Sequence, residues 1–257
     1  MIVEKVTAKE AIDWSPHRHA FLNPYNGCAM GCPFCYWLSF PGWEGRIEVR
    51  TNIVALLEQY LKAGTHKGFL YLGSVCDPFC ELEETYRLTR DCLELIKKYE
   101  VPLLITTSAS SACLLEYTAL LASMPQKVIT VVELSRIPYI EEMNRGGRHK
   151  GITCANALKE KGLEVWTTLA PVLPAVTDLD LVLKALDPHI PVYIDALDCK
   201  EGSIQAEKTM AWIRRDYPEQ AERYHSMMLR HDRRYFEKLL QEKAENPRVK
   251  TFPFPVE

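Results

Sequence analysis

The stretch NPYNGCAMGCPFCYW, residues Asn23 to Trp37, carries three cysteines in the spacing C-x3-C-x2-C. They are Cys28, Cys32 and Cys35, and the stretch holds no fourth cysteine. A structural zinc site needs four ligands, and so does a fully ligated 4Fe-4S cluster. Three thiolates on one short loop leave one iron of a cubane open. An open iron can bind a substrate or cosubstrate. The spacing therefore predicts a cluster that takes part in a reaction and does not only transfer electrons.

Strand and helix patterns alternate on both sides of this loop. Short aliphatic or β-branched runs, bounded by Gly, Pro or polar residues, predict six strands. These are Ala20–Asn23, Gly68–Val75, Pro102–Thr107, Lys127–Glu133, Glu164–Pro171 and Pro191–Ala196. Apolar residues at helical spacing between the strands predict five helices. These are Ile53–Leu61, Leu88–Tyr99, Ala112–Ser123, Gly151–Lys161 and Asp178–Leu186.

Six successive β–α units predict an α/β fold, a partial (β/α)6 TIM-like barrel of parallel strands. The cysteine loop follows the first strand, at the carboxyl edge where such sheets bind ligands. We expect residues 1–200 to form the barrel and residues 201–257 to form a C-terminal helical extension packed on it. The pattern is helical from Ser203 to Glu245, and a Pro-containing tail, Asn246–Glu257, follows.

Composition places the chain among ordinary globular proteins. It has 257 residues, 47% of them apolar and 25% charged, with a net charge of −3. No apolar run reaches the roughly 18 residues of a membrane span, and we expect no secretory signal at the N-terminus. Nine cysteines in such a chain indicate a reducing, cytoplasmic setting and metal-binding or catalytic thiols. We expect Cys92, Cys113 and Cys154 to be small buried side chains.

The cysteine loop resembles that of the radical S-adenosylmethionine (SAM) superfamily, whose signature places an aromatic residue, here Phe34, before the last cysteine. The resemblance implies that the three thiolates hold a 4Fe-4S cluster and that SAM binds its fourth iron. It also implies that one electron cleaves SAM to methionine and a 5′-deoxyadenosyl radical, which abstracts a hydrogen atom from a substrate. A flavodoxin- or ferredoxin-like reductant would supply the electron. The alternative is a zinc knuckle that borrows His17 or His19.

Further motifs resemble the spore photoproduct lyase-like branch of this superfamily. They are Asn23–Cys28, Cys35-Tyr36, Ser74–Phe79, Leu88–Arg90 and Leu169–Pro174. Together they extend from about Phe21 to Pro174, and the C-terminal third shows no match.

This resemblance assigns roles to residues at the strand ends. It places Phe34 against the adenine of SAM and Tyr36 in a hydrogen-atom relay. The implied SAM contacts further along the chain are Ser74, Cys76, Asp77, Ser108 and Glu133. A buried glutamate needs a partner, so we expect Glu133 to meet SAM or Arg136.

The departures from the lyase bear on the substrate. The hydrogen-donating cysteine of the lyase falls at the position of Ser74, whereas Cys76 falls where Ser or Thr is usual, and Cys80 is added. We expect the chain to lack the lyase's N-terminal extension, and its net charge is negative where duplex DNA favours a basic surface. We therefore expect a small-molecule or nucleoside substrate. The rivals are nucleic-acid lesion repair and a non-catalytic iron–sulfur or zinc-binding protein.

Three more cysteines, Cys76, Cys80 and Cys199, follow predicted strands and could face the same barrel mouth. They are candidate hydrogen-atom donors, candidate ligands of a second iron–sulfur cluster, or idle thiols. A cluster of Arg230, Arg233 and Arg234 could grip a phosphate, although a solvated helix face is the simpler interpretation.

Overall fold

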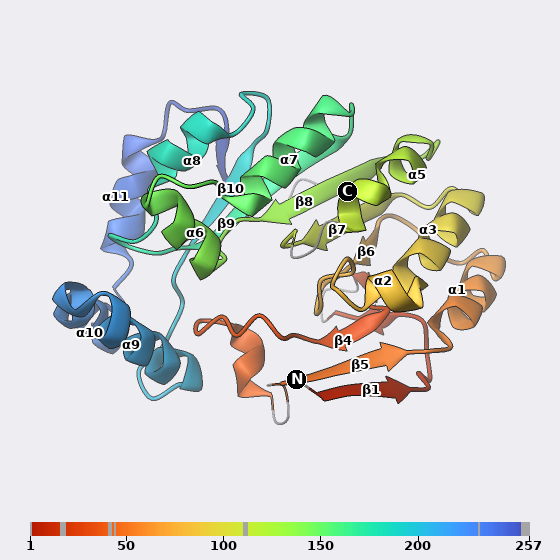
Figure 1. Ribbon diagram of the computed structural model, residues 1–257, viewed down its shortest axis with the longest axis horizontal. Helices are drawn as coiled ribbons and strands as arrows, with labels where there is room; N and C mark the ends of the chain where they lie inside the picture. The colour runs from red at the N-terminus through yellow and green to blue at the C-terminus, as the bar shows by residue number, and fades with distance from the viewer. Residues whose placement is uncertain are drawn as a thin grey trace.

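An eight-stranded, mostly parallel sheet organises the fold (Figure 1). The computed structural model describes residues 2–15, 19–40, 43, 45–109, 113–230 and 232–252, and the sheet has the strand order β11-β10-β9-β8-β7-β6-β3-β2. The central parallel strands are β3 (Ala20–Leu22), β6 (Leu70–Leu72), β7 (Leu103–Thr107), β8 (Val128–Glu133), β9 (Glu164–Val172) and β10 (Val192–Ala196). The predicted strands and the predicted partial barrel of parallel strands are confirmed.

Helices cover one face of this sheet. Alternate strand residues point to opposite faces, so Leu103 and Ile105 enter the main core while Leu104 joins a small cluster with Ile129 and Val131. The helices whose buried residues complete the main core are α1 (Ile53–Lys62), α3 (Leu88–Lys98), α4 (Cys113–Glu116), α5 (Thr118–Ala122), α7 (Lys150–Glu160) and α8 (Leu179–Ala185). Among the described residues, no helix has both the length and the apolar character needed to cross a membrane.

A second, three-stranded sheet holds the cysteine loop. In it β4 (Tyr25–Gly27) pairs antiparallel with β5 (Arg46–Arg50), and β1 (Ile2–Val6) runs parallel to β5. The chain leaves β4 into the cysteine loop and returns through β5. The two ends of the loop are therefore fixed on neighbouring strands, and the loop extends toward the C-terminal helices (Figure 1).

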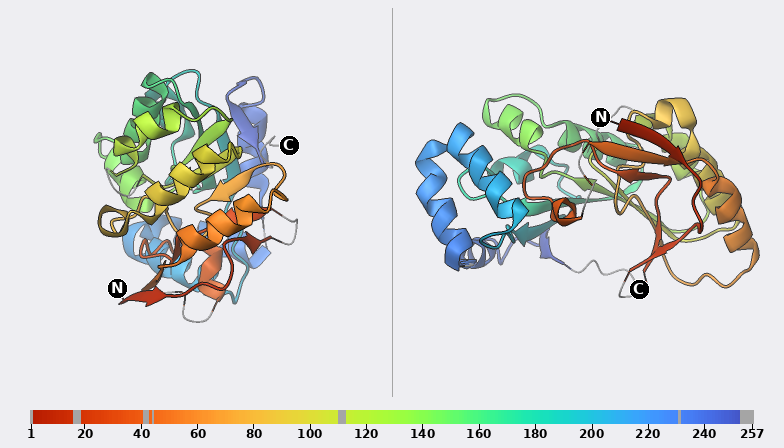
Figure 2. Two further views of the ribbon diagram at one scale, coloured as in Figure 1. Left: turned by 90° about the vertical axis from the view of Figure 1, so that its right-hand side faces the viewer. Right: turned by 90° about the horizontal axis from the view of Figure 1, so that it is seen from below.

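The chain after Ser203 is helical, as its pattern predicts. It forms α9 (Ile204–Asp216), the short η2 (Pro218–Gln220), α10 (Ala221–Arg230) and α11 (Arg234–Glu242). Helices α9 and α10 build a second hydrophobic cluster with Leu173, Val176 and Leu197, whereas α11 buries Phe236 in the main core. Figure 2 shows α9 and α10 grouped at one end of the molecule.

Two sequence predictions about elements are wrong. The helix expected over Ala112–Ser123 is split into α4 and α5 at Tyr117, whose hydroxyl is held by Glu83; Ala112 itself lies outside the described residues. The tail expected after residue 246 contains β11 (Val249–Thr251), which pairs with β10 and extends the sheet.

The strands β1, β4 and β5 of the small sheet were not predicted. Also not predicted were the antiparallel edge strand β2 (Asp13–Trp14), the short helix η1 (Tyr36–Ser39), and the helices α2 (Glu83–Tyr86) and α6 (Ile137–Asn144).

Candidate functional site

The cysteine loop starts at a glycine that the pairing of β4 and β5 requires. Gly27 has a φ of +103°, and a Cβ at this position would collide with the carbonyl oxygen of Arg46 on the paired strand. Glycine adopts such a backbone at low cost. The chain can therefore turn directly from the small sheet into Cys28.

Cys28, Cys32 and Cys35 surround one cavity of about 230 Å³. All three are partly exposed free thiols. The rest of the described lining carries no carboxylate or imidazole; it consists of Ala29, Gly31, Leu38, Trp43 and Gly45. Within the described residues, no three Cys, His, Asp or Glu side chains converge closely enough to hold a single metal ion.

This donor set fits a 4Fe-4S cluster better than a zinc ion. Zinc draws its sulfur ligands to about 2.3 Å from one point. A cubane takes one thiolate on each iron, so its ligands stand apart around a cavity. The alternative fourth zinc ligand, His19, stacks instead on Tyr71 with ring centroids 5.0 Å apart, and His17 lies outside the described residues.

Burial controls the charge of these thiols. It raises the pKa of Cys28 and Cys35, and it raises the pKa of Cys32 to about 12. The metal-free loop therefore holds neutral thiols, and binding of a metal cluster must release their protons.

Phe34 and Tyr36 flank Cys35 and have different surroundings. Phe34 packs against the hydrophobic cluster of α9 and α10, whereas Tyr36 is 61% exposed, with its ring 4.8 Å from that of Trp37. The side-chain amide of Gln205 on α9 donates to the Tyr36 carbonyl at 3.1 Å and to the hydroxyl of Ser39 at 2.6 Å. The C-terminal helices thus hold the end of the cysteine loop.

Asp77 joins the ends of β6 and β7. Its carboxylate accepts hydrogen bonds from the hydroxyls of Thr107 and Ser108, both at 2.8 Å, and from the backbone N–H of Ser108 at 3.2 Å. The Ser108 hydroxyl also lies 3.3 Å from the sulfur of Met30 in the cysteine loop. The structure therefore brings two predicted SAM contacts, Asp77 and Ser108, together beside that loop.

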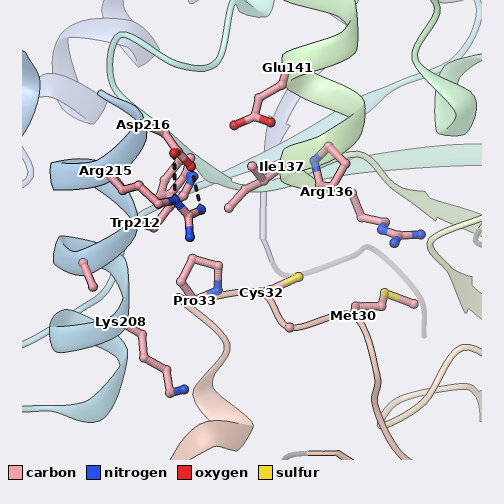
Figure 3. A pocket seen from close by; sticks show the side chains of 13 residues that line it. Met30, Cys32, Pro33, Arg136, Ile137, Glu141, Lys208, Trp212, Arg215 and Asp216 are labelled. Carbon is pink, nitrogen blue, oxygen red and sulfur yellow. Dashed lines mark hydrogen bonds and ion pairs between the residues drawn. The ribbon is translucent and has the colours of Figure 1, made fainter. Parts of the chain in front are cut away.

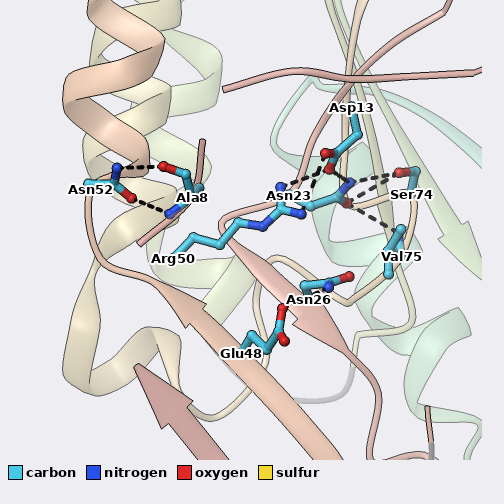
Figure 4. A network of polar contacts seen from close by, with 9 residues as sticks. All are labelled: Ala8, Asp13, Asn23, Asn26, Glu48, Arg50, Asn52, Ser74 and Val75. Carbon is cyan, nitrogen blue, oxygen red and sulfur yellow. Dashed lines mark hydrogen bonds and ion pairs between the residues drawn. The ribbon is translucent and has the colours of Figure 1, made fainter. Parts of the chain in front are cut away.

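Ser74 belongs to a neighbouring network centred on Asn23 (Figure 4). The hydroxyl of Ser74 and the backbone N–H of Val75 both donate to the Asn23 side-chain oxygen at 3.2 Å. Asn23 also donates to Asp13, which forms an ion pair with Arg50 at 2.7 Å. This network ties the ends of β3 and β6 to the small sheet.

Glu133 ends β8 and takes a backbone partner. Its carboxylate accepts a hydrogen bond of 2.7 Å from the N–H of Ser135. Burial raises the pKa of Glu133 to about 7, although the positive charge of Arg136 acts to lower it. We expected SAM or Arg136 as the partner of Glu133. Arg136 instead donates to the hydroxyl of Tyr139 at 2.9 Å, and the hydrogen bond to the Glu133 carboxylate comes from Ser135.

A second cavity of about 220 Å³ adjoins the cysteine loop. Its lining includes Cys28, Cys76, Asp77, Cys80 and Arg136. The structure therefore brings Cys76 and Cys80 to the loop, as the sequence suggested.

Cys199 lies elsewhere. It is buried in the α9/α10 cluster, with its sulfur 3.9 Å from the hydroxyl of Thr209. After β10 the chain turns toward α9, which takes this thiol into the helical cluster. The expectation that Cys76, Cys80 and Cys199 share one mouth is not met, and the described residues bring no such trio together.

A cleft of about 600 Å³ lies between the cysteine loop, α6 and α9 (Figure 3). Its floor is Met30–Pro33 and includes Cys32. Sequence reasoning missed the wall on α9, where Lys208, Trp212 and Arg215 project at helical spacing. That spacing was a usable signal, but it could not show that α9 faces the cysteine loop.

Sequence reasoning also missed Glu83, a buried carboxylate next to the start of the cysteine loop. It accepts hydrogen bonds from the hydroxyls of Tyr25 at 2.5 Å and Tyr117 at 2.7 Å. It also accepts from the backbone N–H groups of Thr89 at 2.9 Å and Arg90 at 3.0 Å. Because Tyr25 lies on β4, Glu83 links the start of the cysteine loop to α3.

The C-terminal arginines are largely engaged with acids. Arg233 pairs with Asp195 at 2.9 Å, and Arg234 pairs with Asp232 at 2.5 Å. These contacts favour a solvated helix face over a phosphate grip.

Comparisons with known proteins agree with the fold. No protein-family model matches the chain. The chain is 24% identical over 228 residues to the uncharacterized protein MJ0683 of Methanocaldococcus jannaschii, covering 85% of each chain. It is 25% identical over 251 residues to the uncharacterized protein Rv2578c of Mycobacterium tuberculosis, covering 88% of this chain and 73% of the relative.

Solved structures with the same fold come from two enzymes. A spore photoproduct lyase variant with bound AdoMet and dinucleoside spore photoproduct matches with a TM-score of 0.58 and 15% identity, over 98% of this chain and 82% of the lyase. SuiB of Streptococcus suis bound to S-adenosylmethionine matches with a TM-score of 0.53 and 15% identity, over 91% of this chain. The chain spans only 50% of SuiB. These matches show that the chain shares the fold of the two proteins, both of which are bound to S-adenosylmethionine in these structures.

Proposed function

We propose that this chain is a radical SAM enzyme whose three loop cysteines hold a 4Fe-4S cluster. The observation that carries the proposal is the cavity of about 230 Å³ walled by Cys28, Cys32 and Cys35. The described residues of this cavity offer three thiols and no fourth donor, which leaves a coordination position for SAM.

In this proposal the chain's own residues bind and orient SAM beside the loop. When bound, the cluster supplies the single electron that cleaves SAM. Asp77 holds Ser108 by hydrogen bonds, so that the Ser108 hydroxyl stays beside Met30 in the loop. Arg136 supplies a cation in the adjoining cavity that can complement the SAM carboxylate. Phe34, Tyr36, Ser74 and Glu133 remain proposed contacts on the strength of the resemblance alone.

A small-molecule or nucleoside substrate suits the cleft beside Cys32. Its volume of about 600 Å³ lies within the roughly 300–1,000 Å³ of small-molecule sites. The net charge of −3 argues against duplex DNA. The free thiols of Cys28, Cys32 and Cys35 fit a reducing, cytoplasmic setting, where a flavodoxin- or ferredoxin-like protein would supply the electron.

Lesion repair in nucleic acid is the rival activity, because a lyase of the same fold binds a dinucleoside photoproduct. Repair would require binding to oligonucleotides that weakens steeply with salt. Arg233 and Arg234 form ion pairs with acidic residues of the same chain, which argues against a basic surface for oligonucleotides.

One experiment tests the proposed function directly. The protein is reconstituted anaerobically with iron and sulfide, reduced with dithionite and given SAM. We expect about four irons per chain and 5′-deoxyadenosine in the products. A fully loaded protein that makes no 5′-deoxyadenosine, with or without candidate substrates, would contradict the proposal and favour a non-catalytic iron–sulfur protein.

A further inference from the structure

Met30 lies on the boundary between two spaces beside the cysteine loop. One is the cavity of about 220 Å³ that contains Arg136 and is proposed to receive the SAM carboxylate. The other is the cleft of about 600 Å³ that is proposed to receive the substrate. Among the described residues, Met30 and Arg136 line both spaces, and their side chains lie at the same end of the cleft (Figure 3). These two side chains therefore separate the small cavity from the cleft.

Arg136 is the fixed side of this boundary. Its Nη1 donates to the hydroxyl of Tyr139 at 2.9 Å, and its guanidinium carbon lies 4.6 Å from the centroid of the Tyr139 ring. Tyr139 is buried, and its own hydroxyl donates to the carbonyl of Ala109 at 3.3 Å. A hydrogen bond and a cation–π contact to one buried residue hold the guanidinium in place.

Met30 is the movable side. Its sulfur lies 3.3 Å from the hydroxyl of Ser108, and the same hydroxyl lies 2.8 Å from the carboxylate of Asp77. A hydroxyl has one hydrogen to donate, and a carboxylate is a much stronger acceptor than a thioether, so Asp77 receives it. Among the described residues, the Met30 side chain thus has no strong polar contact. Methionine is also unbranched and has three rotatable bonds, so it changes its conformation readily.

The size of the small cavity requires movement at this boundary. Its volume of about 220 Å³ lies below the roughly 300–1,000 Å³ of small-molecule sites. SAM joins a nucleoside to an amino acid, so this cavity alone cannot enclose it. In the proposed function SAM must also face a substrate in the cleft, and Met30 lies between the cavity and the cleft.

We propose that Met30 is a movable wall that closes this boundary without ligand and turns aside when SAM binds, an inference that rests on the proposed function. Its movement joins the small cavity to the cleft, while Arg136 stays in place beside the opening. Met30 is then a specificity-determining residue, because its side chain limits how far a substrate extends from the cleft toward SAM.

Calorimetric titration with SAM tests the movable wall without turnover. Wild type, Met30→Ala and Met30→Ile are reconstituted with iron and sulfide and left unreduced, so that SAM binds but is not cleaved. A closed fraction of a binding site lowers its apparent affinity in proportion, so Met30→Ala, which has no wall to move, should bind SAM about 3–10-fold more tightly. Isoleucine is similar in size but stiff at χ1, so Met30→Ile should bind SAM about tenfold more weakly.

The matched control is Met227→Ala. Met227 is half-buried, as Met30 is, but it lies on α10 and lines none of the cavities beside the cysteine loop. Its replacement should leave the affinity for SAM as in the wild type. Iron analysis first establishes that each protein carries about four irons per chain, and either Met30 variant alone decides the question if the other does not load iron.

Two results would overturn the movable wall. One is an affinity for SAM that is unchanged by the replacements of Met30. The other is weaker binding by Met30→Ala, which would make Met30 a direct contact of SAM and not a wall. Either result in a protein that binds SAM contradicts this inference alone. An iron-loaded wild type that binds no SAM contradicts the proposed function, and with it the role of Met30.

Discussion

Replacing Cys32 with alanine should abolish cluster binding and 5′-deoxyadenosine formation. The described lining of the cysteine cavity has three thiols and no substitute donor, so the loss of one thiol leaves too few ligands. Removing even an outer-shell partner of a metal ligand costs about 10–100-fold in affinity or activity, and removing the ligand itself should cost more. We expect less than about one iron per chain after reconstitution, against about four in the wild type. Iron analysis and the 5′-deoxyadenosine assay measure both effects.

The matched control for this prediction is Cys154→Ala. Cys154 is a buried thiol on α7 that belongs to the main core and lines none of the cavities around the cysteine loop. The control should load iron and form 5′-deoxyadenosine as the wild type does. Normal iron loading in Cys32→Ala would show that the loop does not hold the cluster.

Replacing Glu83 with glutamine should destabilise the fold by about 2–3 kcal/mol. The carboxylate accepts two tyrosine hydroxyl and two backbone N–H hydrogen bonds in a fully buried setting. An amide keeps one oxygen and turns an N–H₂ group toward the remaining donors. A hydroxyl can reorient, but the backbone N–H of Thr89 or Arg90 cannot, so one buried donor loses its partner.

Urea unfolding followed by circular dichroism measures this loss. The neighbouring Glu84→Gln on the same short helix is the control, because Glu84 is exposed and exposed substitutions usually change stability by less than about 0.5 kcal/mol. Equal free energies of unfolding for the two variants would show that the Glu83 network adds nothing to stability.

The strands and the cysteine loop could be predicted because their signals are local. The run Leu103–Thr107 is buried at four of its five positions, and its aliphatic and β-branched residues are typical of a strand. The small sheet lacked such a signal: β1 and β5 mix apolar and charged residues, and β1 has no fully buried residue. The strand β11 was missed because three residues in a Pro-containing tail become a strand only by pairing with β10.

The parts of the site that could be predicted are those formed by residues close together in the sequence. Cys76 and Cys80 line the same cavity because the Asp77 turn lies between them. The position of Cys199 depends on the path of the chain into α9, and no local sequence pattern predicts that path. Glu83 stands in a run of acids that resembles a solvated helix start, and its burial depends on Tyr25 and Tyr117 from distant segments.

The central claim is that the cysteine loop holds a cluster with one iron open to SAM. The most direct test is electron paramagnetic resonance of the reconstituted, dithionite-reduced protein, recorded before and after SAM is added. Binding of SAM to the open iron changes the surroundings of that iron, so we expect the cluster signal to change shape and position. A cluster signal that stays the same at saturating SAM would contradict the claim.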